Sequence, residues 1–288
     1  MSTPAPEKKR IPELPYELER QILELSARAH PKRAPQLALV SRYVQIWVEA
    51  VIYETIVLGG IGRSKQDLFW STLSLRPPNF FSKNVRHLHL TSGVSYTRAR
   101  HLISVCTNLS TLTCWANPLS TREELRALLS PNLRRLSIDA DMLWPRNGPN
   151  IVPDLTHPVF ASLTHLEIVN PRSGFDWSPL LDGSVPRLTH LAMGDLEAAH
   201  AESLIPFFCD ALASEDPRLE LIIAVSRSEH FLDAVALAAD LKDTPRFVCL
   251  PSYHHPLGPT EYWEGVSRRE VEFWSRRDAI SSNVVSKD

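Results

Sequence analysis

Apolar residues recur in the middle of this chain in a short formula that repeats at a regular interval. In five six-residue segments, positions 1, 4 and 6 are apolar, and position 3 is polar in every segment. The segments cover residues 85–90, 109–114, 133–138, 163–168 and 188–193, so successive starts lie 24, 24, 30 and 25 residues apart. Because side chains alternate along a strand, the formula predicts short strands whose position-4 and position-6 side chains share one buried face.

Repeats of this length predict a stack of similar strand-turn-helix units. One such unit cannot bury its own apolar face, whereas stacked units share a continuous core. A weaker sixth unit is expected to start at Leu219, and a seventh near Phe247. We therefore expect an α/β protein in which a curved leucine-rich-repeat-type solenoid with parallel strands occupies residues 85–256.

The N-terminal part of the chain has helical spacing instead. Four apolar residues recur at steps of four, four and three: Leu14, Leu18, Ile22 and Leu25. This spacing predicts an amphipathic helix with Pro15 in its first turn, where the missing N–H costs nothing. The dipeptide His30-Pro31 is expected to end the helix, because a residue before proline avoids the helical conformation.

A second helical run is predicted immediately afterwards. Its apolar residues are Leu37, Val40, Val44, Trp47 and Val51. Two helices in fewer than about 45 residues are too small to form a stable core alone. We expect a disordered tail over 1–12 and a helical module over 13–52 that packs on the solenoid, on a partner, or on both.

This module resembles an F-box. The resemblance rests on Leu14-Pro15-x-Glu17-Leu18-x-x-x-Ile22, on Leu37-x-Leu39-Val40-Ser41 and on Trp47. In that family the segment docks onto the Skp-type linker subunit of an SCF ubiquitin ligase, and C-terminal repeats select the substrate. The resemblance implies that six residues bind the linker subunit: Leu14, Pro15, Leu18, Ile22, Val40 and Trp47.

The resemblance extends beyond this module. Residues 48–58, residues 76–81, Trp263 and Phe273-Trp274 are similar to basidiomycete F-box-like repeat proteins. The chain departs from the F-box pattern in a longer connection between its two halves and in Val44, which stands where an aromatic residue is usual. The resemblance implies a substrate-recognition adaptor with an unidentified protein target. The alternative is a repeat scaffold whose F-box-like helices only cap the solenoid.

Residues 53–84 are expected to contribute a strand at 56–58 and a helix at 65–75 before Pro77-Pro78. The connection between them, 59–65, contains three glycines. Glycines between a strand and a helix can expose backbone N–H groups to a phosphate, which makes a nucleotide-dependent enzyme a second alternative. The third glycine of the GxGxxG pattern is missing and Ser64 precedes Lys65, so a turn without a ligand is the favoured interpretation.

Three capping-box spacings predict where later helices start. The pairs Ser120/Glu123, Ser226/Glu229 and Ser267/Glu270 place helices near 121–129, 227–242 and 267–279. The last of these belongs to residues 257–288. We expect that region to cap the final repeat, because an open end would expose strand edges and apolar surface.

The side chains at positions 3 and 5 are expected to point away from the leucines and to form the target-binding surface. The residues assigned to this surface are His87, His89, Thr111, Arg135, His165, Glu167 and His190. A weakly cationic, histidine-bearing surface suits an acidic or phosphorylated segment, although duplication of a polar repeat explains the same pattern. With an unperturbed histidine pKa near 6.5, binding of an acidic target should tighten as the pH falls from about 8 to 6.

The amino-acid composition and charge argue against some classes of partner for this protein. The chain has 288 residues, a formal net charge of −2 and a pI near 6.6, which indicates neither nucleic acid nor an acidic membrane as a partner. Its apolar runs are shorter than a membrane helix needs. Four cysteines without CxxC spacing predict reduced thiols in the cytoplasm or nucleus.

The sequence contains no pattern that predicts an enzyme. It lacks a nucleophile elbow, an HExxH motif and a Walker loop, and it has only ten glycines for strained catalytic turns. His165 and His190 are expected to lie on adjacent strands, but nothing fixes further metal ligands near them. We therefore expect no catalytic residues, no metal and no cofactor.

Overall fold

The chain divides into two units, Met1–Tyr53 and Glu54–Asp288. The computed structural model describes residues 14–59, 63–77, 79–116, 127–144, 152–214, 218–242 and 244–276. Within these ranges, no helix combines the length and the apolar composition that crossing a membrane requires.

From residue 14 onward, the N-terminal unit contains three helices, α1 (Tyr16–Ala29), α2 (Ala34–Leu37) and α3 (Arg42–Ile52). The first helix forms as expected, with Pro15 at its N-cap and His30 at its C-cap. The prediction of one further helical run is wrong, because α2 ends at Leu37 and α3 begins after Ser41. The Ser41 hydroxyl accepts a hydrogen bond from the Val44 backbone N–H at 3.3 Å and so caps a new helix.

The core of this unit lies between α1 and α3. Its buried residues are Ala27, Ala34, Val44, Trp47 and Val48. Leu23 packs against this core from α1, whereas Leu18 and Ile22 on the same helix are exposed. The helix therefore buries one apolar face within the unit and leaves a second apolar face uncovered.

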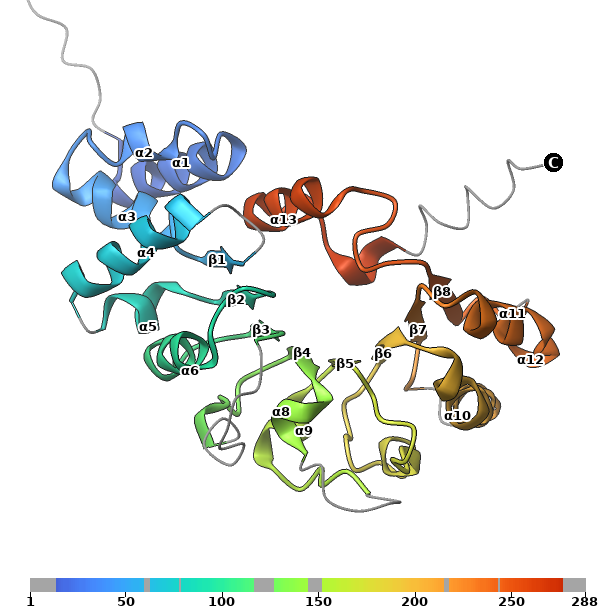
Figure 1. Cartoon of the computed structure of the whole chain (residues 1–288). Helices are drawn as coiled ribbons and strands as arrows, with labels where there is room; N and C mark the ends of the chain where they lie inside the picture. The colour runs from blue at the N-terminus through green and yellow to red at the C-terminus, as the bar shows by residue number, and fades with distance from the viewer. Residues whose placement is uncertain are drawn as a thin grey trace, which may run out of the picture. The chain divides into compact units, whose positions relative to one another are not determined.

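The second unit is built on one sheet of eight parallel strands, which lie side by side in sequence order (Figure 1). The strands are β1 (Thr55–Leu58), β2 (His87–Leu90), β3 (Thr111–Cys114), β4 (Arg135–Asp139), β5 (His165–Val169), β6 (His190–Leu196), β7 (Leu221–Ser226) and β8 (Phe247–Leu250). Each of the seven expected repeat strands is present, and the strand expected at 56–58 adds β1 beside β2. The α/β class and the parallel pairing are thus confirmed.

The strands pair with the same formula positions aligned. His87, Thr111, Arg135, His165 and His190 face one another from strand to strand, all at position 3. The position-4 leucines form the buried ladder beside them, each at most 1% exposed: Leu88, Leu112, Leu136, Leu166 and Leu191. The periodic leucines determine the register, because a shift by one residue would turn the whole ladder to the other face.

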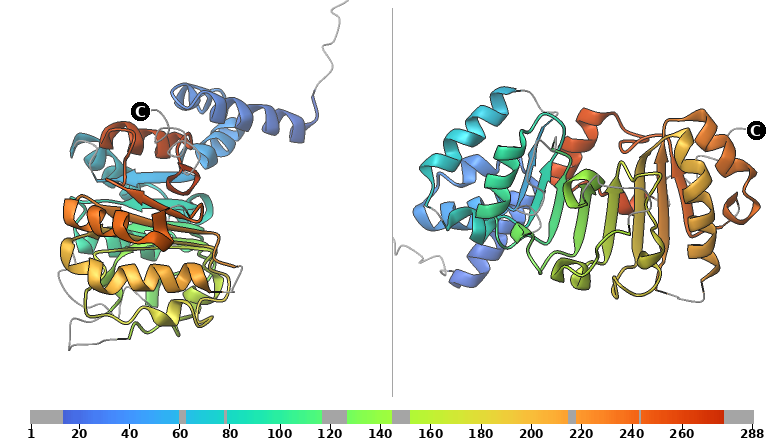
Figure 2. Two further views of the ribbon diagram at one scale, coloured as in Figure 1. Left: turned by 90° about the vertical axis from the view of Figure 1, so that its right-hand side faces the viewer. Right: turned by 60° about the horizontal axis from the view of Figure 1, so that its bottom comes forward.

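The two faces of the sheet are covered differently. The outer face carries the connecting helices α4 (Arg63–Leu75), α5 (Phe80–Asn84), α6 (Tyr96–Val105), α8 (Ala140–Leu143), α9 (Pro158–Ser162), α10 (Ala201–Ala213), α11 (Glu229–Leu237) and α12 (Ala239–Lys242) (Figure 1). The inner face carries residues 251–276, which we call the C-terminal segment; they include α13 (Pro259–Arg268) and η3 (Phe273–Arg276). Figure 2 shows this segment along the side of the sheet opposite the connecting helices.

The expected helix boundaries near the C-terminus need correction. The helix predicted near 267–279 is wrong, because α13 starts after Gly258 with Pro259 in its first turn and ends where Arg269 adopts a left-handed conformation, φ 63°. The Ser267 hydroxyl donates to the Glu264 carbonyl at 2.7 Å instead of starting a helix.

The helix predicted at 227–242 is divided into α11 and α12. Its N-cap is Ser228, whose hydroxyl accepts from the Phe231 N–H at 3.4 Å. Ser226, the predicted cap, instead donates to the Leu196 carbonyl at 2.6 Å. The helix predicted near 121–129 falls mostly outside the described residues, as do the glycines at 60–62.

Candidate functional site

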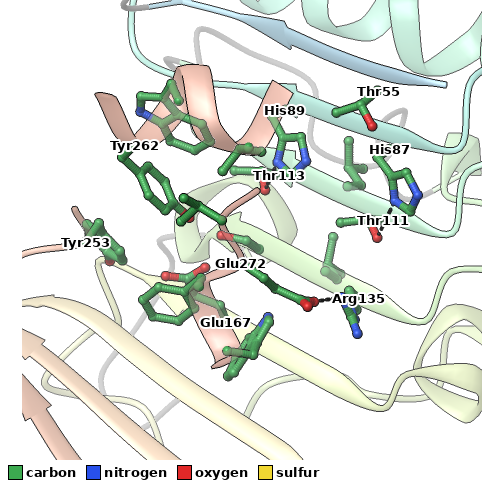
Figure 3. Close-up of a pocket in the computed structure, with 18 of the residues that line it drawn as sticks. Thr55, His87, His89, Thr111, Thr113, Arg135, Glu167, Tyr253, Tyr262 and Glu272 are labelled. Atoms are coloured by element: carbon green, nitrogen blue, oxygen red, sulfur yellow. Dashed lines mark hydrogen bonds and ion pairs between the residues drawn. The ribbon is translucent and has the colours of Figure 1, made fainter. Parts of the chain in front are cut away.

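A partly open cavity of about 230 Å³, which we call the sheet cavity, lies between the inner face of the sheet and the C-terminal segment (Figure 3). The sheet contributes mainly polar side chains at positions 3 and 5 of β2–β5, together with Thr55 on β1. These side chains point inward because the leucines that alternate with them pack toward the outer helices. The C-terminal segment contributes aromatic side chains from the opposite side.

The C-terminal segment is attached to the sheet at two places. Tyr262, Trp263 and Val266 on α13 pack against Val57 of β1 and Trp115 after β3. Phe273 packs in an apolar cluster with residues of the last strands, namely Ala192, Leu221, Ile223, Val225 and Leu250. The segment was expected to cap the final repeat only, but it spans the inner face from the first strand to the last.

Two ion pairs reinforce this attachment. The Glu272 carboxylate pairs with the Arg135 guanidinium on β4, as Figure 3 shows. The Arg269 guanidinium pairs with the Glu54 carboxylate just before β1. All four side chains keep partial contact with solvent, so each pair contributes modestly to stability.

Aromatic rings form much of the wall of the sheet cavity. The Trp115 ring lies 4.8 Å from that of Tyr253 and 5.6 Å from that of Trp263, measured between centroids. The Trp115 indole N–H donates to the Ser137 hydroxyl at 2.8 Å, which holds the ring against β4. Trp274 also lines the cavity.

Two histidine–threonine pairs line the sheet side of the cavity. His87 Nδ1 lies 3.0 Å from Thr111 Oγ1, and His89 Nδ1 lies 2.9 Å from Thr113 Oγ1, each across neighbouring strands (Figure 3). Burial lowers the pKa of His89 to about 3, with a further contribution from the nearby His87. Burial also lowers the pKa of His87. Both rings are therefore neutral at physiological pH.

The structure changes the interpretation of the predicted target-binding surface. Five of its seven residues line the sheet cavity, namely His87, His89, Thr111, Arg135 and Glu167. The other two, His165 and His190, lie against the Trp274 ring. The expectation that this face is openly displayed is wrong, because the C-terminal segment covers it and leaves Glu167 only 4% exposed.

The predicted pH dependence must also be corrected. It assumed histidines with a pKa near 6.5, but burial lowers the pKa of His89 and of His165 to about 3. These rings gain no charge between pH 8 and 6, so they cannot tighten the binding of an acidic target over that range.

Several residues of the cavity were not assigned to a site from the sequence. They are Thr55, Trp115, Tyr253, Tyr262, Trp263, Glu272, Phe273 and Trp274, among others. The available signal was the concentration of aromatic residues at 253–274, where no position of the repeat formula calls for them. Sequence reasoning assigned Trp263 and the Phe273-Trp274 pair to the resemblance and to a cap, and so missed their shared position over the sheet.

The residues predicted to bind a linker subunit divide into two groups. Leu14, Pro15, Leu18, Ile22 and Val40 are all exposed on the N-terminal unit. Trp47 is only 5% exposed and stacks edge-on against Tyr16, with centroids 4.8 Å apart. Its assignment as a contact residue is therefore corrected, since its ring stabilises the core of the unit.

A metal site and a reactive thiol each place requirements on the described residues. In the parts of the chain that the structure describes, no group of three His, Cys, Asp or Glu side chains is placed to hold a metal. Burial raises the pKa of Cys106 and Cys114 to about 12, so both thiols stay protonated and unreactive. Most of the proposed phosphate loop, including the Lys65 side chain, lies outside the described residues.

No protein-family model matches the chain, and no curated protein matches it either.

Proposed function

We propose that this protein is a substrate-recognition adaptor whose N-terminal helices dock onto the Skp-type linker subunit of an SCF-type ubiquitin ligase. The observation that carries the proposal is the uncovered apolar face of α1, where Leu18 is 46% exposed and Ile22 is 53% exposed. These residues belong to the F-box-like motif at the start of the chain. Val40, from the second half of that motif, is 68% exposed.

An apolar face of this kind is costly to leave in water. The exposed large apolar residues of the unit are Leu14, Tyr16, Leu18, Ile22, Leu25, Leu39, Val40, Tyr43 and Ile46. Scattered apolar residues need no explanation, but apolar residues gathered on one small helical unit mark an interaction site. A partner with an apolar groove would bind α1 by contacting Leu18, Ile22 and Leu25, which lie on one stripe of the helix.

In this proposal the strand-and-helix units of the second unit form the leucine-rich-repeat-type solenoid that presents a protein target. The residues expected to contact the target lie under the C-terminal segment. A target therefore reaches His87 or Arg135 only when that segment moves aside. Surfaces of the outer helices remain open to a target without such a movement.

The test is capture of a purified Skp-type linker subunit by the full-length protein. The double substitution Leu18→Asp plus Ile22→Asp should abolish capture, because two carboxylates would have to lose water in an apolar interface. The matched control is Leu237→Asp, which introduces the same charge at a leucine that is 86% exposed on α11. Both variants should keep the wild-type circular dichroism spectrum.

The outcome also decides between the adaptor and the alternative scaffold. A folded wild-type protein that never captures the linker subunit supports the scaffold. Capture that survives the double substitution would show that another surface binds the subunit.

A further inference from the structure

We infer that the sheet cavity is a binding site for a small, uncharged, flat aromatic molecule that carries one hydrogen-bonding group. The site lies entirely within the unit Glu54–Asp288, so it is independent of docking by the N-terminal helices. A ligand there would touch the polar inner face of the sheet on one side and the C-terminal segment on the other.

The size of the cavity limits the ligand to one or two rings. Its volume of about 230 Å³ exceeds the roughly 150 Å³ of a cavity that admits benzene. It lies below the roughly 300 Å³ at which pockets for drug-sized ligands begin. A well-packed protein core contains few voids of this size, so the packing between sheet and segment is incomplete.

The aromatic wall favours a flat ligand. Trp115, Tyr253 and Trp263 form a connected group of rings, with centroid distances of 4.8 and 5.6 Å from Trp115. Tyr262, Phe273 and Trp274 add further rings to the wall. Rings at such distances offer faces and edges against which another aromatic ring packs in stacked or perpendicular geometry.

The charges around the cavity favour an uncharged ligand. Its two arginines are already matched, Arg135 by Glu272 and Arg269 by Glu54. The histidines of the wall add no positive charge, because they are half-buried and hydrogen-bonded in neutral pairs with threonines. Two carboxylates, those of Glu167 and Glu272, line the cavity together with the two arginines. A charged ligand of either sign would therefore lose its hydration without gaining an uncompensated opposite charge.

The polar groups of the wall supply the hydrogen bond. His87 and His89 use Nδ1 for their threonine partners, which leaves the Nε2 side of each ring for another group. The Thr55 hydroxyl on the same wall is buried and has no hydrogen-bond partner among the described residues. A buried hydroxyl without a partner costs free energy, and a ligand hydroxyl or a small shift of the wall would relieve that cost.

The test uses the full-length protein with phenol and naphthol as uncharged probes and naphthoate as the charged one. In isothermal titration calorimetry, we expect saturable binding of at least one uncharged probe and affinity at least about tenfold lower for naphthoate. Thr55→Phe should abolish binding, because the added ring fills the cavity without removing a hydrogen bond. Thr97→Phe is the matched control, since Thr97 is exposed on α6 and outside the cavity wall.

A second readout separates this site from binding elsewhere. A ligand that joins the sheet to the C-terminal segment should slow tryptic cleavage after Arg268 and Arg269 in the wild type but not in Thr55→Phe. If Thr55→Phe does not fold, Val271→Phe adds a ring to the same cavity from the C-terminal segment without removing a side-chain hydrogen bond. The inference is overturned if neither uncharged probe binds saturably, if the folded cavity-filling variant binds as the wild type does, or if naphthoate binds equally well.

Discussion

The imidazole rings of His165 on β5 and His190 on β6 stack face to face, with centroids 4.1 Å apart and planes inclined by 11°. Trp274 of the C-terminal segment meets both rings nearly at right angles, at centroid distances of 5.1 and 5.8 Å. Burial, together with the adjacent His190 and Arg135, lowers the pKa of His165 to about 3. The stack is thus a packed contact that holds the segment on the sheet, and His165 is neutral within it.

We expect the stability of the protein to depend on pH through His89 and His165. His89 and His165 have a pKa near 3 in the folded protein and near 6.5 in the unfolded chain. Below about pH 6.5 the unfolded chain binds protons that the folded protein does not, so the free energy of unfolding falls as the pH falls. The loss is up to about 1.4 kcal/mol per pH unit for a histidine fully removed from solvent, and it is smaller for His89 and His165, which are half-buried.

Urea unfolding at several pH values between about 4 and 8 measures this dependence. The variant His89→Asn should show a shallower loss of stability on acidification than the wild type. Stability that stays constant or rises below about pH 6 would contradict the assignment of buried, neutral histidines.

We expect a substitution of Gly194 to destabilise the protein. This glycine on β6 lies against Tyr253, whose ring carbon Cε1 would be 2.9 Å from an added Cβ atom, closer than side chains pack. Gly194→Ala should therefore displace the partly buried Tyr253 ring and lower the free energy of unfolding by about 1–3 kcal/mol. Thermal unfolding measures the loss. A variant as stable as the wild type would mean that the ring moves aside freely.

The leucine ladder predicts a contrast between two leucines. Leu136 is 1% exposed in the centre of the sheet, whereas Leu237 is almost fully exposed on α11. Leu136→Ala should lower the free energy of unfolding by about 2–5 kcal/mol through the cavity it leaves. Leu237→Ala should change it by less than about 0.5 kcal/mol. Chemical denaturation followed by circular dichroism gives both values, and equal effects would contradict the shared ladder.

The N-terminal unit predicts a similar contrast between Trp47 and Ile22. Trp47→Ala should destabilise that unit by about 3–5 kcal/mol, since the ring lies in its core. Ile22→Ala should have an effect below about 0.5 kcal/mol, because Ile22 is exposed. Hydrogen exchange of the α1 and α3 amides, read by mass spectrometry, reports on this unit separately. Faster exchange in Ile22→Ala than in Trp47→Ala would contradict the assignment of Trp47 to the core of the unit and of Ile22 to its surface.

The repeat formula allowed the sheet to be predicted in detail. Every strand from β2 to β6 begins at position 3 of its formula, and the position-4 leucines are buried as expected. The formula succeeds because pairing and burial of each strand depend on residues only a few positions apart, repeated at nearly constant distance. The prediction of a helix at 267–279 was wrong for the opposite reason. It depended on one capping pair that does not recur, and the left-handed conformation of Arg269 ends α13 inside the predicted range.

The sequence by itself determined which side chains lie on each face of the sheet, because alternation along a strand is a local property of the backbone. Only the tertiary structure decided that residues 251–276 return across the inner face and border a cavity there. It also decided that α1 buries Ala27 and leaves Ile22 in solvent. Both results depend on contacts between segments far apart in sequence, and such contacts follow from the packing of the whole unit rather than from any local pattern.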